Sequence, residues 1–220
     1  MMGKAKFFAA MAGFLAVLAA GVVLAAAPVA LVEEVSGIKT LEVLDYVSAG
    51  QVVDLGKGGS LTLGYLSSCV HEEIAGGRVT IGEKESKVKN GKVTRSKVVC
   101  DGGRLMLAAN QAVQSAATAV RDVDLKGEPK VVVYDTSPLI TLPKTGRVVI
   151  KRVDMPGERH TIEMAGNANM KTRLDLANEN ILLAPGGIYM VSVGGMAQIF
   201  QVATEAKRGG VPLVGRLVPF

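Results

Sequence analysis

The stretch "CVHEEIAGGRVTIGEKESKVKNGKVTRSKVVC", residues 69–100, holds both cysteines of the chain and one of its two histidines. Three interpretations are open: a zinc site of Cys69, His71 and Cys100, a nucleophilic thiol, or a disulfide bond. Zinc sites usually offer cysteines in close pairs, whereas 31 positions separate these two. His71 lies two residues from Cys69 on the same expected strand, which is not a typical arrangement for a catalytic base. The compartment in which the chain folds decides among the three.

The N-terminus indicates export. In "MMGKAKFFAAMAGFLAVLAAGVVLAAAPVALV", Lys4 and Lys6 precede an uncharged apolar run over residues 7–32. This layout is typical of a secretory signal peptide, and at about 26 residues the run is also long enough to span a bilayer of ~30 Å. We predict that residues 1–27 are a signal peptide or an uncleaved anchor helix, with membrane contact through residues 7–32 if uncleaved. By the positive-inside rule, the protein is then periplasmic, secreted, or inner-membrane anchored facing the periplasm.

An oxidising compartment favours pairing of the two cysteines. We therefore predict a disulfide between Cys69 and Cys100, with no metal site. Closing a loop of this length stabilises the fold by roughly 3–4 kcal/mol in the chain-entropy model.

Glycine pairs indicate the fold of the first half. "GGSLTL" from Gly58, "GGRVTI" from Gly76, "NGKVTR" from Asn90 and "GGRLML" from Gly102 each place a pair suited to positive φ before a β-favouring run. We predict consecutive turns of a β-roll or β-meander over residues 28–126. Residues 108–117 fit either a short helix or a further strand.

A polar break, "KGEPK" around Gly127, separates a second run of short strands. These strands include "KVVVYD", "RVVIKRVD", "HTIEMAG" and "KTRLDLA", followed by a hairpin of residues 188–193 and 196–202 joined by Gly194 and Gly195. Their spacing predicts a small antiparallel Ig-like sandwich over residues 127–220, and hence an all-β chain.

Charge and motifs restrict the function. Setting Lys4 and Lys6 aside leaves 23 basic against 20 acidic residues, a net charge of +3, so we predict no nucleic-acid partner. GxSxG, HExxH and GxxxxGK[ST] do not occur, and we predict neither enzymatic activity nor a cofactor.

The acidic residues fit structural roles. Glu72 and Glu73 are adjacent, so a strand would point them to opposite faces. Asp135, Asp154 and Asp175 lie in turn-like contexts, where carboxylates commonly cap backbone amides.

Basic residues cluster inside the 69–100 stretch. We expect them on a hairpin around Asn90 and Gly91, where they either bind a polyanion, such as a phosphorylated envelope glycan or lipid headgroup, or form a solvated edge that discourages aggregation. The candidate patch is Lys84, Lys87, Lys89, Lys92, Arg95 and Lys97.

The phrase "VSAGQVVDLGKGGSLTLGYLSSC", residues 47–69, resembles FecR-like periplasmic domains of bacteria, and the resemblance extends over about residues 48–121. "ILLAPGGIYMVSVGG", from Ile181, is similar to the Ig-like segments that accompany such domains. FecR-type regulators have a cytoplasmic segment before their membrane span, whereas six residues precede Phe7 here, so sigma-factor regulation is not expected. The resemblance implies a non-catalytic ligand- or protein-binding module of the cell envelope, with sensing as one role of such a module and an envelope protein or glycan as partner. The alternative is a periplasmic hydrolase or glycan-modifying enzyme without a recognisable motif.

Overall fold

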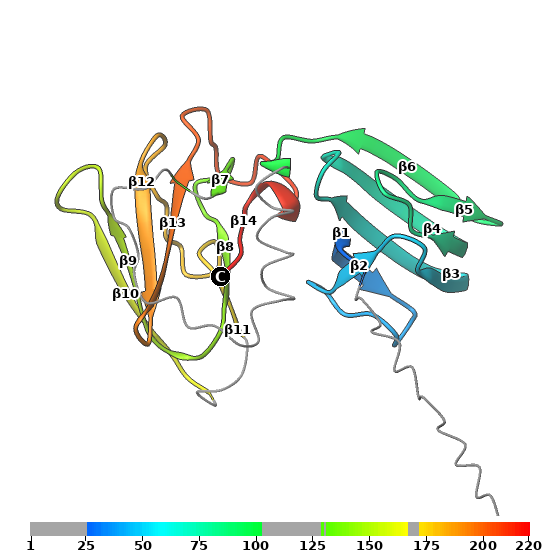
Figure 1. The fold of residues 1–220 in the computed structure, drawn as a ribbon, viewed down its shortest axis with the longest axis horizontal. Helices are drawn as coiled ribbons and strands as arrows, with labels where there is room; N and C mark the ends of the chain where they lie inside the picture. The colour runs from blue at the N-terminus through cyan, green and yellow to red at the C-terminus, as the bar shows by residue number, and fades with distance from the viewer. Residues whose placement is uncertain (1–25, 103–128, 130, 167–171) are drawn as a thin grey trace, which may run out of the picture.

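The computed structural model describes residues 26–102, 129, 131–166 and 172–220 (Figure 1). The regular elements of these residues are strands and a single 3-10 turn, so the predicted all-β fold is confirmed. In the first half, strands pair in the order β2-β1-β3-β4-β5, and β6 also pairs with β4. The bounds are β1 Pro28–Ser36, β2 Tyr46–Ser48, β3 Val52–Tyr65, β4 Val70–Thr80, β5 Lys87–Lys89 and β6 Lys92–Lys97.

Strands β3, β4 and β5 are consecutive antiparallel neighbours, as in the predicted meander, but the chain does not reverse at the predicted glycine pairs. Gly58 and Gly76 lie inside the long strands β3 and β4, where the β3–β4 register shifts between Asp54 and Ser60. Asn90 and Gly91 do not form a hairpin turn either, because β5 and β6 both pair antiparallel with β4. Residues 87–97 are thus one edge strand, interrupted opposite the Gly76–Gly77 pair. The fourth predicted pair, at Gly102, lies at the limit of the described residues.

The irregular positions of three neighbouring strands lie next to one another: residues 54–60 in β3, Gly76–Gly77 in β4, and Asn90–Gly91 between β5 and β6. We call the bend that they form the crease. Val79 pairs with Val53 on one side and Val88 on the other, and Ile74 pairs in the same way with Leu61 and Val93. These side chains lie in or against the core of the first half. The crease therefore lets each strand present apolar residues to the same core on both sides of the bend.

β1 corrects part of the leader prediction. Residues 28–32 form its first half and are buried between β2 and β3, with Ala30 and Val32 fully inaccessible. The predicted membrane contact through residues 7–32 is therefore wrong for its last five residues, while residues 7–25 lie outside the described residues. Across the described ranges, we find no helix that is both long and apolar enough to cross a membrane.

The second half is a sandwich. Within the described residues, one sheet has the order β10-β9-β12-β13-β7 and the other β11-β8-β14. Most pairs are antiparallel, as predicted, but β7 pairs parallel with β13 and β14 parallel with β8. The bounds are β7 Val131–Val133, β8 Leu139–Leu142, β9 Gly146–Arg152, β10 Arg159–Met164, β11 Thr172–Asp175, β12 Ile188–Val193, β13 Met196–Val202, η1 Leu213–Gly215 and β14 Leu217–Val218.

The hairpin prediction is confirmed to the residue: β12 and β13 meet across Gly194 and Gly195, both at positive φ. By contrast, the predicted domain boundary at residues 126–127 and the segment 108–117 both lie outside the described residues.

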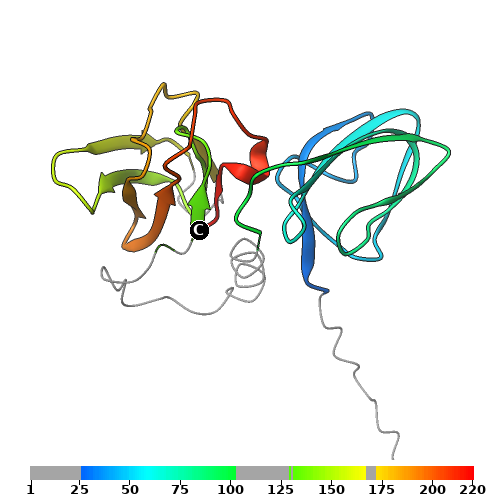
Figure 2. The same cartoon turned by 90° about the horizontal axis from the view of Figure 1, so that it is seen from above.

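The two halves lie side by side with η1 between them, in both views (Figures 1 and 2). Leu31 and Leu66 from the first half belong to the hydrophobic cluster of the second half, together with Val214 of η1. The Glu33 carboxylate accepts hydrogen bonds from the backbone N–H groups of Val214 (2.7 Å) and Leu213 (3.3 Å). The junction is therefore both apolar and hydrogen-bonded.

Candidate functional site

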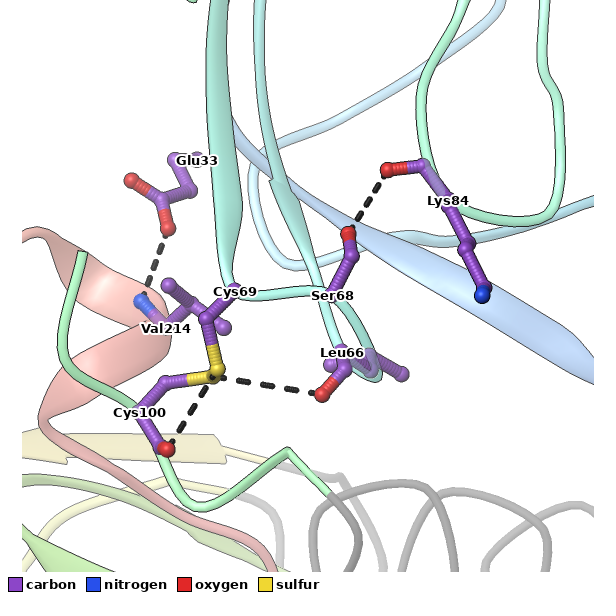
Figure 3. The surroundings of a disulfide bond; sticks show 7 residues. All are labelled: Glu33, Leu66, Ser68, Cys69, Lys84, Cys100 and Val214. Carbon is purple, nitrogen blue, oxygen red and sulfur yellow. Dashed lines mark hydrogen bonds between the residues drawn. A yellow bond between two sulfur atoms is a disulfide. The ribbon is translucent and has the colours of Figure 1, made fainter. Parts of the chain in front are cut away.

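Cys69 and Cys100 form a disulfide bond, which confirms the predicted pairing (Figure 3). Their Cα atoms lie 5.7 Å apart. The bond closes the end of the β4–β6 ladder, where the Val98 N–H donates to the Cys69 carbonyl. In the part of the chain that the structure describes, no group of three or more His, Cys, Asp or Glu side chains is placed to hold a metal ion.

A buried ionic network fixes the loop inside the clipped stretch. Glu72 on β4 is fully buried and accepts hydrogen bonds from Arg95 Nε (2.7 Å) and from the Ser86 N–H (3.0 and 3.2 Å to its two oxygens). Arg95 also donates to the Ser86 carbonyl (2.6 Å), and the Ser86 hydroxyl lies 2.8 Å from the Tyr65 hydroxyl. Burial raises the pKa of Tyr65 to about 12. The loop at residues 82–86 is thereby anchored to the sheet beneath it.

A second contact holds the same loop to the disulfide turn. The Ser68 hydroxyl donates to the Lys84 carbonyl at 2.6 Å, next to Cys69 (Figure 3). The disulfide turn and the ionic network thus both hold the loop at residues 82–86, which leads into the edge strand β5–β6.

The structure divides the predicted basic patch. Val88 and Val93 pack toward the core, so Lys87, Lys89 and Lys92 project from the opposite face, which we call the outer lysine row. Arg95 and Lys97 share the inward face with Val93, and Arg95 is engaged by Glu72. Lys84 is exposed in the preceding loop. The expected hairpin cluster of six is therefore replaced by a row of lysines along one strand.

The edge strand that carries this row has an open side. Within the described ranges, β4 is the sheet partner of both β5 and β6, and no strand pairs with their other edge. The side chains of Lys87, Lys89 and Lys92 are exposed, and no ion pair to them is seen among the described residues. Among the described residues, this strand thus combines an unpaired sheet edge with exposed lysines on its outer face.

The histidines sit in separate places. His71 lies against Glu33 at the junction, with Nε2 3.3 Å from Oε2, and His160 lies 3.5 Å from Glu158 at the β9–β10 end of the sandwich. The Tyr189 hydroxyl donates a hydrogen bond to the same Glu158 (2.7 Å), and burial raises the pKa of Tyr189. Neither histidine lines the pocket beside Leu44 and Arg173 or the hollow beside Gly194 and Gly195, both formed by described residues. The hydrolase alternative stays a prediction without geometric support.

The predicted roles of the acidic residues hold. Glu72 is buried and Glu73 exposed, as alternation requires. Asp135 caps the Ser137 N–H, Asp154 the Ile188 N–H and Asp175 the Ala177 N–H.

Sequence reasoning missed Glu33 and the pairing of Glu72 with Arg95. Burial of a carboxylate depends on partners far along the chain, and no local pattern marks them.

Comparisons of this chain with protein-family models, curated proteins and solved structures find no match. The resemblance to FecR-like domains therefore stays a prediction.

Proposed function

We propose that the chain is a non-catalytic binding module of the bacterial cell envelope, acting in the periplasm or at the membrane surface that faces it. Its ligand is a phosphate-bearing envelope component, either a phosphorylated glycan or a lipid headgroup. The disulfide supports this placement, because such bonds persist in oxidising compartments.

The outer lysine row is the observation that carries the proposal. Lys87, Lys89 and Lys92 project from one face of a strand that the Glu72–Arg95 network and the disulfide hold in place. Because the strand backbone is held in place, a polyanion meets three positive charges together without having to order the chain that carries them. A row that served only to discourage edge pairing would bind no particular anion.

Co-sedimentation with lipid vesicles tests the proposal. We expect the purified protein to bind vesicles containing phosphatidylglycerol and not pure phosphatidylcholine, with affinity falling as salt rises. A phosphorylated oligosaccharide without acyl chains forms the second arm: competition by it at low concentration would identify the glycan as the ligand. The variant Lys87→Glu/Lys89→Glu/Lys92→Glu should lose binding in either arm.

A matched control separates the row from overall charge. Lys39→Glu/Arg159→Glu/Lys207→Glu makes the same change in net charge at exposed positions outside the edge strand. We expect this control to bind nearly as well as the wild type. Equal losses in both triple variants, or no binding of wild type to either anion, would overturn the proposal.

A further inference from the structure

A pocket of about 440 Å³ lies at the junction of the two halves. Val43 and Leu44, from the loop before β2, form one wall. The second half supplies the rest, including Arg173, Leu174, Asp175, Glu179, Leu213 and Arg216. This volume is in the range of small-molecule sites, which commonly occur where domains meet. The outer lysine row lies elsewhere, so this is a separate site.

Leu44, in the pocket wall, has a backbone conformation that leucine rarely adopts. Its φ is +74°, a region that bulky L-residues rarely adopt. Two hydrogen bonds of 2.8 Å to β1 hold this loop, from Leu44 N–H to the Val32 carbonyl and from Val32 N–H to the Asp45 carbonyl. The side chain packs against the cluster of the second half. Unfavourable backbone geometry that the surroundings enforce is concentrated at functional sites.

Some charged side chains of the pocket already pair with one another, whereas Arg173 has no partner among the described residues. Asp175 binds Arg216 through two contacts of 2.7 Å, and Arg216 also donates to the Ser137 carbonyl at 2.9 Å. Arg173 is exposed at the pocket, and no hydrogen bond or ion pair to its side chain is seen among the described residues. A guanidinium that no described residue pairs with, beside leucine side chains, suits a planar anion attached to an apolar group.

We propose that this junction pocket binds a small molecule with a carboxylate on an apolar body, and that Arg173 pairs with the carboxylate. Leu44 and Leu213, which are both partly exposed, contact the apolar body. Because Leu44 comes from the first half and Leu213 and Arg173 from the second, the ligand bridges the two halves.

Titration with octanoate, followed by NMR of the labelled amides, tests this site. We expect shifts at Leu44, Leu174 and Leu213, and octylamine, which has the same chain length without the carboxylate, should bind at least tenfold more weakly. L-leucine forms a second arm: Glu179 lines the same pocket and would pair with its ammonium group, so binding that Glu179→Gln weakens would identify an amino acid as the ligand. Binding of octanoate alone would identify an aliphatic acid, and either result supports the proposal.

Two variants address the roles of the walls. Arg173→Ala should raise the dissociation constant at least tenfold, whereas Arg159→Ala, an exposed arginine outside the pocket, should not change it. Leu44→Gly removes the wall and suits the positive φ, so it should weaken binding while the protein stays folded. The proposal is overturned if neither octanoate nor L-leucine binds, or if Arg173→Ala binds as tightly as the wild type.

Discussion

Arg95 Nε lies 2.7 Å from Glu72 Oε1, and the Glu72 side chain has no exposed surface. The pair joins two adjacent strands at directly opposed positions. A carboxylate in this position is stable only because Arg95 and the Ser86 N–H complete its hydrogen bonds. Arg95, which the sequence placed in the candidate basic patch, thus stabilises the buried carboxylate of Glu72.

Removing Arg95 tests this role. Arg95→Ala leaves Glu72 buried without its cation, and breaking a buried pair costs about 3–5 kcal/mol. Since Arg95 is itself 35% exposed, we expect a loss of unfolding free energy at the lower end of that range in urea denaturation. Lys92→Ala, an exposed change on the same strand, should stay within about 0.5 kcal/mol. Equal effects of the two variants would contradict the interior role of Arg95.

The disulfide makes a prediction about reduction. Opening the Cys69–Cys100 bond should lower the unfolding free energy by about 3–4 kcal/mol, because the denatured chain regains the freedom of a 31-residue loop. Melting curves with and without reductant measure the loss, and the Cys69→Ser/Cys100→Ser variant should not respond to reductant. Thiol titration should find no free thiol in the native protein. Two titratable thiols or stoichiometric zinc would count against the disulfide.

The crease contains a glycine, Gly77, whose replacement by alanine should be unusually destabilising. Gly77 has a φ of +79°, and a Cβ there would collide with the Lys89 carbonyl across the β4–β5 pair. Gly50 has a similar φ of +85° but open space around it. In urea denaturation, Gly50→Ala should cost about 1–2 kcal/mol for the backbone alone, and Gly77→Ala about 1–3 kcal/mol more for the collision. Similar losses for both would show that the strands can separate at the crease.

These glycines also show where sequence reasoning fails. Gly194–Gly195 and Gly76–Gly77 look alike locally, yet the first pair turns a hairpin and the second bends a strand. The difference is what the flanking residues pair with: residues 188–193 pair with residues 196–202, whereas both flanks of Gly76–Gly77 pair with other strands. A local pattern predicts that the chain bends, and only long-range pairing decides whether it reverses.

For the candidate site too, local patterns predicted some features and long-range pairing decided the others. Alternation placed Glu72 and Glu73 on opposite faces, and export with two cysteines indicated the disulfide. Which basic residue would be drawn to Glu72 depends on the β4–β6 register, which composition does not encode. The junction pocket needs Leu44 and Arg173 to meet from segments over a hundred residues apart, so no motif announces it.

Glu33 gives the junction a dependence on pH. Its side chain is 7% exposed, and burial raises its pKa above the ordinary 4.5, although the N–H groups of Val214 and Leu213 and the nearby His71 oppose the rise. Arg216 also experiences the charge of Glu33. The Glu33 carboxyl group therefore binds its proton more tightly in the folded protein than in the unfolded chain. The stability that this proton adds is fully present below pH 4.5, and it is lost as the pH rises through the raised pKa of Glu33 in the folded protein.

Urea denaturation between pH 4 and 7 measures this effect. Glu33→Gln keeps a carbonyl oxygen for the Val214 N–H but cannot ionise, so the stability of the wild type should fall relative to this variant as the pH rises from about 4.5. Glu34→Gln, an exposed neighbour on β1, should run parallel to the wild type. If wild type and Glu33→Gln instead keep a constant difference across the range, ionisation of Glu33 does not weaken the junction.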